Sequence, residues 1–329
     1  MILSDRIYGV MEIKEPVICD IIKTQEFQRL YGVSMGGWCP ADPFHAWSVS
    51  RYEHSIGVFM LLRKYGATIE EQISGLIHDL NTPAFSHLCD YLFGTEEDQK
   101  TGGFQEHTWE RFVRNSKTGQ IIADHGFNLD YILDDRHFPL KENNLPDICA
   151  DRIDYGLRVI DFMKRYGKLL WVDEVAMANM FIATGTEFIC KNQSVAENFA
   201  RVFNETDEQK YSSFDQLVYN LNMWRMFRDA IDSRIISEVD FFTLTDMQIV
   251  KKLYDADIDM SIIYENSKKS VPSSSQPSKV YFAKCRRIDP KFADNDGKIK
   301  KLSEVNPKYA EYMKKVPKYF EYEVAERQK

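Results

Sequence analysis

Histidine and aspartate side chains that could hold a metal ion recur along this 329-residue chain. His54 shares a helical face with Val58 and Leu61, so we expect its imidazole to face inward, where it needs a polar partner. The dipeptide His78-Asp79 ends an apolar helical stripe and places a second imidazole and a carboxylate near the core. A divalent cation would satisfy such a set, because mixed imidazole and carboxylate sites suit Zn, Fe, Mn, Co or Ni.

A further ligand should come from elsewhere in the chain, and Asp151 is the best candidate. It lies in a segment where Asp147, Asp154, Tyr155 and Arg158 fall on the same face at helical spacing. A solvent-exposed helix can carry the same polar stripe, so this pattern leaves both interpretations open.

The elements that must position these residues are predicted to be mainly helical. The side chains of residues 7–13 alternate loosely around a glycine, which predicts a short β-hairpin. Residues 31–50 are predicted to form a structured loop near the site. Helical periodicity is expected over 15–30, 51–65, 70–80, 84–93, 104–135, 145–166 and much of 171–265. Ser, Pro and Lys dominate 266–279, which we interpret as a linker or long loop, and 280–329 predicts a small α+β appendage to a core over 1–265.

The composition narrows the class of partner. There are 42 Lys and Arg against 50 Asp and Glu, a net charge of −8, which argues against sequence-independent nucleic-acid binding. No strictly apolar run exceeds five residues, and the N-terminus lacks a basic region followed by an apolar one, so we expect neither a membrane span nor a signal peptide. Six scattered cysteines favour free thiols. We therefore expect a cytoplasmic protein.

Four ordered blocks resemble the HD-domain phosphohydrolase superfamily, and within it the branch of bacterial dGTP triphosphohydrolases and the SAM- and HD-domain dNTP triphosphohydrolase. The blocks are Ile21-Ile-Lys-Thr-Gln-Glu-Phe-Gln-Arg-Leu30, Arg51-Tyr-Glu-His-Ser-Ile-Gly57, Gly75-Leu-Ile-His-Asp-Leu-Asn-Thr-Pro-Ala-Phe-Ser-His87 and Asp151-Arg-Ile-Asp-Tyr155. The resemblance implies an HD-domain helical bundle in which His54, His78, Asp79 and Asp151 hold one divalent ion, which could be Mn, Fe, Co, Ni, Zn or Mg.

Cationic residues around these blocks are candidates for binding phosphate. The resemblance implies a phosphate contact at Arg51 and a nucleotide contact at Tyr155, and Arg152 and Arg158 are further candidates. Each arginine could instead form an ordinary surface ion pair, which contributes little.

A second group of residues is predicted to transfer protons, and it consists of His87, Asp90 and His107. His87 and Asp90 are three residues apart on one short predicted helix, so they can form a hydrogen bond. An imidazole held by a carboxylate is a suitable proton donor to a leaving oxygen. The resemblance gives histidines at the places of His87 and His107 general acid, general base or phosphate-binding roles. A helix-capping pair is the alternative for His87 and Asp90.

Several positions depart from the family pattern. Thr82 stands where the motif has its second His, and the order around His107 is Glu-His-Thr where the branch has His-Glu. Met35 and Val159 replace a Gln and an Asp that lie near the sugar in some dNTP triphosphohydrolases, and an aliphatic side chain cannot form a hydrogen bond with a hydroxyl. Phosphate hydrolysis remains compatible with these changes, whereas deoxynucleotide selection loses support.

We therefore expect a metal-dependent phosphohydrolase that acts on a small phosphorylated molecule, with a (deoxy)nucleoside triphosphate as the leading substrate. The alternatives are a phosphomonoesterase, a non-catalytic nucleotide-binding sensor, and a two-iron oxygenase in which His87 and His107 would be further ligands. Relatives in this branch often assemble, so a homo-oligomer is a further expectation.

Overall fold

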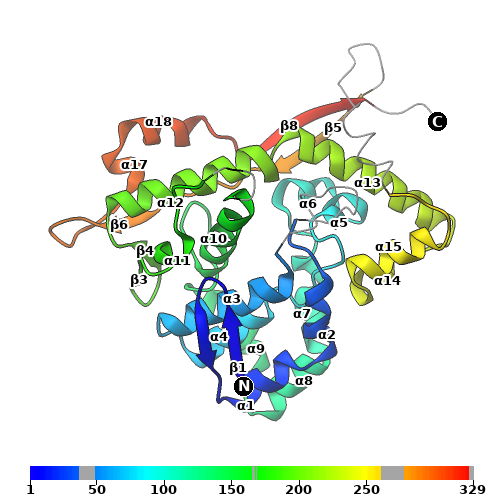
Figure 1. Cartoon of the computed structure of the whole chain (residues 1–329), viewed down its shortest axis with the longest axis horizontal. Helices are drawn as coiled ribbons and strands as arrows, with labels where there is room; N and C mark the ends of the chain where they lie inside the picture. Colours follow the sequence, from blue (N-terminus) through cyan, green and yellow to red (C-terminus); the bar gives the residue numbers. More distant parts are fainter. Residues whose placement is uncertain (37–48, 165–166, 168, 261–277, 326–329) are drawn as a thin grey trace.

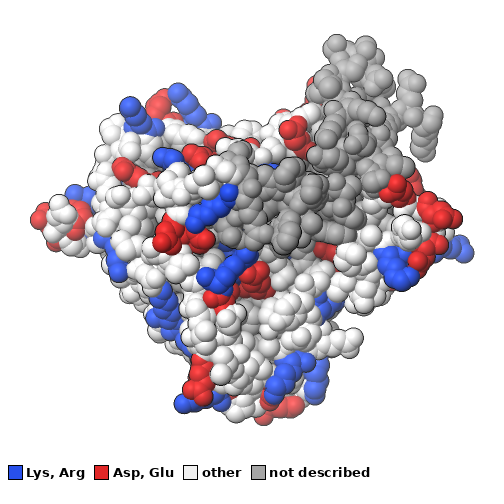
Figure 2. All heavy atoms as spheres, in the orientation of Figure 1, with Lys and Arg blue, Asp and Glu red and all other residues white. Residues whose placement is uncertain are grey.

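The computed structural model describes residues 1–36, 49–164, 167, 169–260 and 278–325 of the chain. Helices dominate it, as the sequence predicts, and several small β-elements lie at its edges (Figure 1). None of the described helices is long and apolar enough to cross a membrane. On the face drawn in Figure 2, Lys and Arg side chains are interspersed with Asp and Glu.

The N-terminal part forms the predicted hairpin and then turns helical. The hairpin begins earlier than predicted, because Ile2 already pairs with Glu12. Thr24 caps α2 by accepting a hydrogen bond from the Phe27 amide. The elements are β1 (Ile2–Asp5), β2 (Gly9–Glu12), α1 (Pro16–Ile22), α2 (Gln25–Arg29) and the 3₁₀ turn η1 (Leu30–Gly32). Most of the predicted loop over 31–50 lies outside the described residues.

Helix α3 (Arg51–Lys64) packs against both α4 (Ile69–Ile77) and α10 (Ala150–Lys164). The sequence predicts α3 to within a residue, because the Ser50 hydroxyl accepts a hydrogen bond from the Glu53 amide and starts the helix. Helix α4 ends earlier than predicted, so His78 and Asp79 follow its last turn.

The helix predicted over 84–93 is shorter in the structure, where α5 covers Leu88–Leu92. Pro83 precedes this region, and Phe85 and Ser86 have positive φ values of 62° and 48°, which are incompatible with a right-handed helix. The segment predicted over 104–135 is divided into several helices. The elements between α5 and α10 are α6 (Glu96–Thr101), α7 (Glu106–Arg114), α8 (Lys117–Asp124), α9 (Leu129–Ile132) and η3 (Asp135–His137).

The helical prediction for 171–265 is wrong at two short strands, β3 (Phe181–Ala183) and β4 (Phe188–Cys190). They pair around a turn at Gly185, whose φ of 94° favours glycine. The remaining elements are helical: α11 (Glu174–Met177), α12 (Gln193–Thr206), the π-helical turn η4 (Asp207–Tyr211), α13 (Phe214–Asp232), α14 (Glu238–Thr243) and α15 (Asp246–Tyr254).

The C-terminal residues pack against the helical core. Strand β6 pairs in parallel with β4, so the sheet β3-β4-β6-β7 joins both parts of the chain. Ile288, Phe292 and Leu302 are buried in the same apolar cluster as Leu157 and Phe199. The elements are β5 (Ser278–Lys284), β6 (Lys291–Ala293), β7 (Ile299–Lys301), α17 (Leu302–Val305), α18 (Pro307–Lys315) and β8 (Tyr319–Ala325), which pairs antiparallel with β5. The predicted linker lies outside the described residues, apart from its last two positions.

Candidate metal centre

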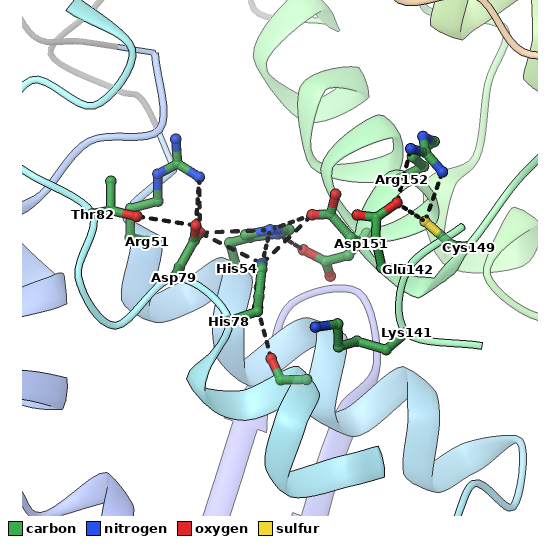
Figure 3. A network of polar contacts seen from close by, with 12 residues as sticks. Arg51, His54, His78, Asp79, Thr82, Lys141, Glu142, Cys149, Asp151 and Arg152 are labelled. Carbon is green, nitrogen blue, oxygen red and sulfur yellow. Dashed lines mark hydrogen bonds and ion pairs between the residues drawn. The ribbon is translucent and has the colours of Figure 1, made fainter. Parts of the chain in front are cut away.

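His54 lies at the centre of a polar cluster formed where α3 packs against α10 (Figure 3). It is fully buried in the first turn of α3. Its Nδ1 lies 2.7 Å from Asp154 Oδ2 and its Nε2 lies 2.9 Å from Asp151 Oδ1. Because Asp151 and Asp154 are three residues apart on α10, one helix face supplies a carboxylate to each ring nitrogen.

His78 directs its Nε2 into the same cluster. Its Nδ1 lies 2.7 Å from the Gly75 carbonyl oxygen, an acceptor only, so Nδ1 carries the proton and donates it. Its Nε2 lies 3.1 Å from His54 Nε2 and 3.6 Å from Asp151 Oδ1. The backbone at the end of α4 therefore fixes the tautomer that leaves a lone pair facing His54.

Asp79 lies on the other side of the imidazoles from Asp151 (Figure 3). Its Oδ2 is 3.8 Å from His54 Nε2 and 3.6 Å from His78 Nε2. Arg51 Nη1 donates to both oxygens of this carboxylate, at 3.0 and 2.8 Å, and the Thr82 hydroxyl donates to Oδ1 at 3.0 Å. Asp79 is thus a buried carboxylate held at the edge of the cluster.

Four side chains that can bind a cation therefore lie close together. His54, His78 and Asp151 each offer a ligand atom within 4.8 Å of the other two, and Asp79 borders the same space. Two nitrogens about 2.1 Å from one ion and at right angles would lie about 3.0 Å apart. The observed 3.1 Å between the two Nε2 atoms fits shared coordination, so the donor set suits a divalent ion.

The charges in the cluster also favour a bound cation. Burial lowers the pKa of His54, but hydrogen bonds to Asp151 and Asp154 outweigh burial and raise that pKa to about 9. Burial raises the pKa of Asp79, but Arg51 and the two imidazoles hold that pKa well below its usual range. The cluster therefore favours a positive charge between its carboxylates, from a proton or from a metal ion.

Arg158 and Gly57 hold the second partner of His54 in place. Arg158 Nε donates to Asp154 Oδ2 at 2.7 Å, and its Nη2 lies 2.7 Å from Asp5 Oδ2. A Cβ at Gly57 would lie 2.0 Å from both Arg158 Nη2 and Asp154 Oδ1. Only glycine at this position lets the Asp154–Arg158 pair reach α3 one turn after His54.

A pocket adjoins the cluster on the side of Tyr155, whose ring centroid is 6.5 Å from that of His54. His87 and Asp90 line it, and His87 Nδ1 lies 3.0 Å from Asp90 Oδ2, so the predicted pair is present. Burial lowers the pKa of His87 more than Asp90 raises it, so the neutral imidazole is favoured. The wall also includes Met35, Arg158, Val159, Lys210, Tyr211, Lys284 and Arg286.

Two predicted site residues lie apart from this arrangement. The His107 side chain is 67% exposed on α7 and its Nε2 lies 3.2 Å from Asp98 Oδ1. Arg152 points away from the imidazoles and pairs with Glu142 at 2.8 Å (Figure 3). Neither His87 nor His107 joins a group of three or more candidate metal ligands within the described part of the chain.

Supporting residues that sequence reasoning missed lie around the loop after Asp79. Arg29, in the first block of the family resemblance, donates to the carbonyl oxygens of Thr82 and Leu244. Gln105 Oε1 lies 3.1 Å from the Thr82 hydroxyl. Asp154 belongs to the helical stripe and to the fourth block, but neither pattern indicates its contact with His54 Nδ1. Lys284 and Arg286 carry no sequence signal, because they lie far along the chain from every block.

No protein-family model matches the chain. It is 36% identical over 204 residues to the uncharacterised protein YdhJ of Bacillus subtilis, a match that covers 62% of this chain and only 60% of the relative. It is 26% identical over 301 residues to a protein of Cordyceps militaris named metal-dependent phosphohydrolase, covering 88% of this chain and 84% of the relative.

A third relative is the deoxynucleoside triphosphate triphosphohydrolase SAMHD1 homolog of Dictyostelium discoideum, 36% identical over 187 residues that cover 47% of this chain and 35% of that protein. Among solved structures, a phosphohydrolase from Bacteroides thetaiotaomicron matches 99% of this chain and all of its own chain, with a TM-score of 0.71 and 14% identity. The last likeness concerns the fold alone.

Proposed function

Because its relatives confirm the resemblance to the HD-domain phosphohydrolase superfamily, we propose that this chain is a metal-dependent phosphohydrolase acting on a nucleotide, with a (deoxy)nucleoside triphosphate as the leading substrate. The observation that carries the proposal is the convergence of His54 and His78 Nε2 with the carboxylates of Asp79 and Asp151. Such a donor set is costly to bury unless a cation occupies it.

The four residues His54, His78, Asp79 and Asp151 would hold the ion. A divalent ion there lowers the pKa of water and offsets the charge on the phosphoryl oxygens, which otherwise repel a nucleophile. Asp154 and the Gly75 carbonyl oxygen keep the Nδ1 proton of each imidazole away from the ion, as hydrogen-bond partners of ligand histidines generally do.

His87 is placed to move the proton that hydrolysis requires. Its neutral form is favoured before substrate arrives, and an anionic phosphate in the pocket would favour the protonated form. His87 would then take up a proton on binding and deliver it to the leaving oxygen, while Asp90 holds the ring at Nδ1. His107, which is exposed and paired with Asp98, has no part in this proposal.

A phosphomonoesterase is the second candidate, and one observation favours it. The site has a hydroxyl at Thr82 and an amide at Gln105, in contact with each other beside Asp79, where the triphosphohydrolase branch carries a motif imidazole at the position of Thr82. One fewer imidazole means one fewer donor for the oxygens of a polyphosphate.

The test incubates purified protein with Mn, Co, Ni, Fe or Mg and a panel of dNTPs, NTPs and nucleoside monophosphates, with products separated by chromatography. We expect release of triphosphate from a nucleoside triphosphate, and release of inorganic phosphate alone from a monophosphate would favour the second candidate. Asp151→Asn should abolish turnover, whereas Asp147→Asn, which affects an ion pair with Lys291, should not. Absence of turnover with every metal and substrate would contradict the proposal.

A further inference from the structure

The arginines closest to the metal centre are already neutralised by carboxylates. Arg51 pairs with Asp79 at 2.8 Å, and Arg152 pairs with Glu142 at the same distance. Arg158 is fully buried and its ion pairs include one with Asp154. A substrate anion would have to compete with these carboxylates, so the three arginines predicted from sequence are poorly available to bind it.

Two other cations line the pocket without such a partner. Lys284 and Arg286 face the pocket that His87 and Tyr155 also line, and neither forms an ion pair with a carboxylate among residues 1–36, 49–164, 169–260 and 278–325. Burial, and next the positive charge of Arg286, lower the pKa of Lys284 to about 8, although the carboxylates of Glu106 and Glu142 act in the opposite direction.

Neighbouring contacts hold the chain around these two residues. Lys284 ends β5, and it and Arg286 both line the pocket, whereas Cys285 and Arg287 are buried. Arg287 forms a buried ion pair with Asp207 of the π-helical turn η4. This turn also supplies Tyr211, whose ring lies 5.9 Å from the Arg286 guanidinium.

Hydrogen bonds also hold β5 and the residue that follows it. The Tyr91 hydroxyl donates to the Phe282 carbonyl oxygen at 2.9 Å, and the Cys285 amide donates to the Lys318 carbonyl oxygen at 3.0 Å. A cation on such a rigid element loses little conformational freedom when it binds an anion, which favours affinity.

We propose that Lys284 and Arg286, supplied by the C-terminal part of the chain, bind the anionic phosphate group of the substrate beside the metal centre. The inference rests on the proposed function, because it names the residues that hold the substrate of that site. It makes the segment after residue 278 part of the active site, and it makes Arg287 a positioning residue for Arg286.

The test measures binding of inorganic phosphate to the full-length, Mn-loaded protein by isothermal titration calorimetry. Arg286→Met and Lys284→Met are each expected to weaken phosphate binding about tenfold, since each removes one charge-assisted contact. Arg286→Lys should retain much of the affinity. The control is Lys318→Met, an exposed lysine that immediately precedes β8, which should bind phosphate like the wild type. Manganese affinity and melting temperature should be unchanged in all four variants.

The inference is wrong if the wild type binds no phosphate, if Arg286→Met and Lys284→Met bind it as the wild type does, or if Lys318→Met loses as much affinity as they do. Failure of the proposed function gives a different pattern. Wild-type protein that binds phosphate through Arg286 but hydrolyses no phosphate ester would refute the enzyme and leave this binding site standing.

Discussion

Asp79 has two roles at the scale of a single side chain, because it faces both the imidazoles and Arg51. Asp79→Ala would remove a metal ligand and leave the Arg51 guanidinium buried without its carboxylate. We expect lost metal binding and turnover together with about 3–5 kcal/mol of lost stability, measured by urea unfolding of the metal-free protein. The double variant Arg51→Met, Asp79→Met should recover most of the stability without recovering metal binding. Unchanged stability in Asp79→Ala would contradict the buried pair.

His87 is expected to act on the reaction and not on the metal. His87→Gln keeps a polar side chain beside Asp90 but cannot carry the proton. Turnover should fall about 100-fold or more, while metal affinity stays within about twofold. Because the reaction needs the protonated imidazole and the pKa of His87 is lowered in the free enzyme, kcat/KM should rise as pH falls toward that pKa, which lies below 6.5, and this rise should be absent in His87→Gln. Equal losses of metal affinity and turnover would make His87 a ligand instead.

At the scale of single residues, the sequence points to His54, His78, Asp79 and Asp151 because each belongs to a local motif whose spacing is visible in the chain. The structure places these four side chains close together, and their role as metal ligands stays a prediction. Lys284 and Arg286 could not be found in this way. Their position depends on pairing of β5 with β8 and of Arg287 with Asp207, which are long-range contacts without a local pattern.

At the scale of elements, the close approach of α3 and α10 determines whether His54 can meet Asp151. Gly57→Ala should force the Asp154–Arg158 pair away from α3 and tilt the imidazole. We expect about 1–3 kcal/mol of lost stability and a clear loss of metal affinity, although residue 57 touches no ligand atom of the ion.

Gly156→Ala is the matched control for this prediction. It adds the same methyl group to α10, but on the side that faces Phe199, where the nearest atom would be 3.1 Å away. It should cost some stability and leave metal affinity unchanged. If Gly57→Ala binds metal as tightly as the wild type, the α3–α10 contact does not position the site.

Elements were predicted well where their signals were local. Ser50 marks the start of α3, and the stripe of Ile73, Leu76 and Ile77 marks α4. The strands β3 and β4 were missed because each has three residues, too few to establish a two-residue period. Strand β4 forms through its pairing with β3 and β6. Its pairing with β6 joins Cys190 to Phe292, two positions far apart in the sequence.

At the scale of the whole molecule, the buried carboxylate of Asp246 forms hydrogen bonds with two segments that are distant in sequence. Its titration should make the free energy of unfolding depend on pH. Its carboxylate accepts hydrogen bonds from the amides of Ser34 and Phe85, and burial raises its pKa to about 6 despite them. A folded-state pKa above the unfolded value of 3.8 means that the protonated form favours folding. This contribution is present below about pH 4 and is lost as pH rises to about 6.

The measurement is urea unfolding of the wild type and of Asp246→Asn between pH 4 and pH 7. The stability of the wild type relative to the variant should fall by about 2 kcal/mol between pH 4 and pH 6 and level off by about pH 7. Asparagine does not titrate, so all other ionisable groups cancel in the difference. A difference that stays constant over this range would show that Asp246 titrates normally.

The position of a bound metal ion tests the central claim most directly. Crystals of the manganese-loaded protein, measured at an X-ray wavelength where manganese scatters anomalously, would locate the ion without reference to activity. We predict one anomalous peak within about 2.0–2.3 Å of the Nε2 atoms of His54 and His78, with carboxylate oxygens of Asp151 and Asp79 completing the coordination. A fully loaded crystal with no peak between these imidazoles, or with its peak elsewhere, would contradict the account.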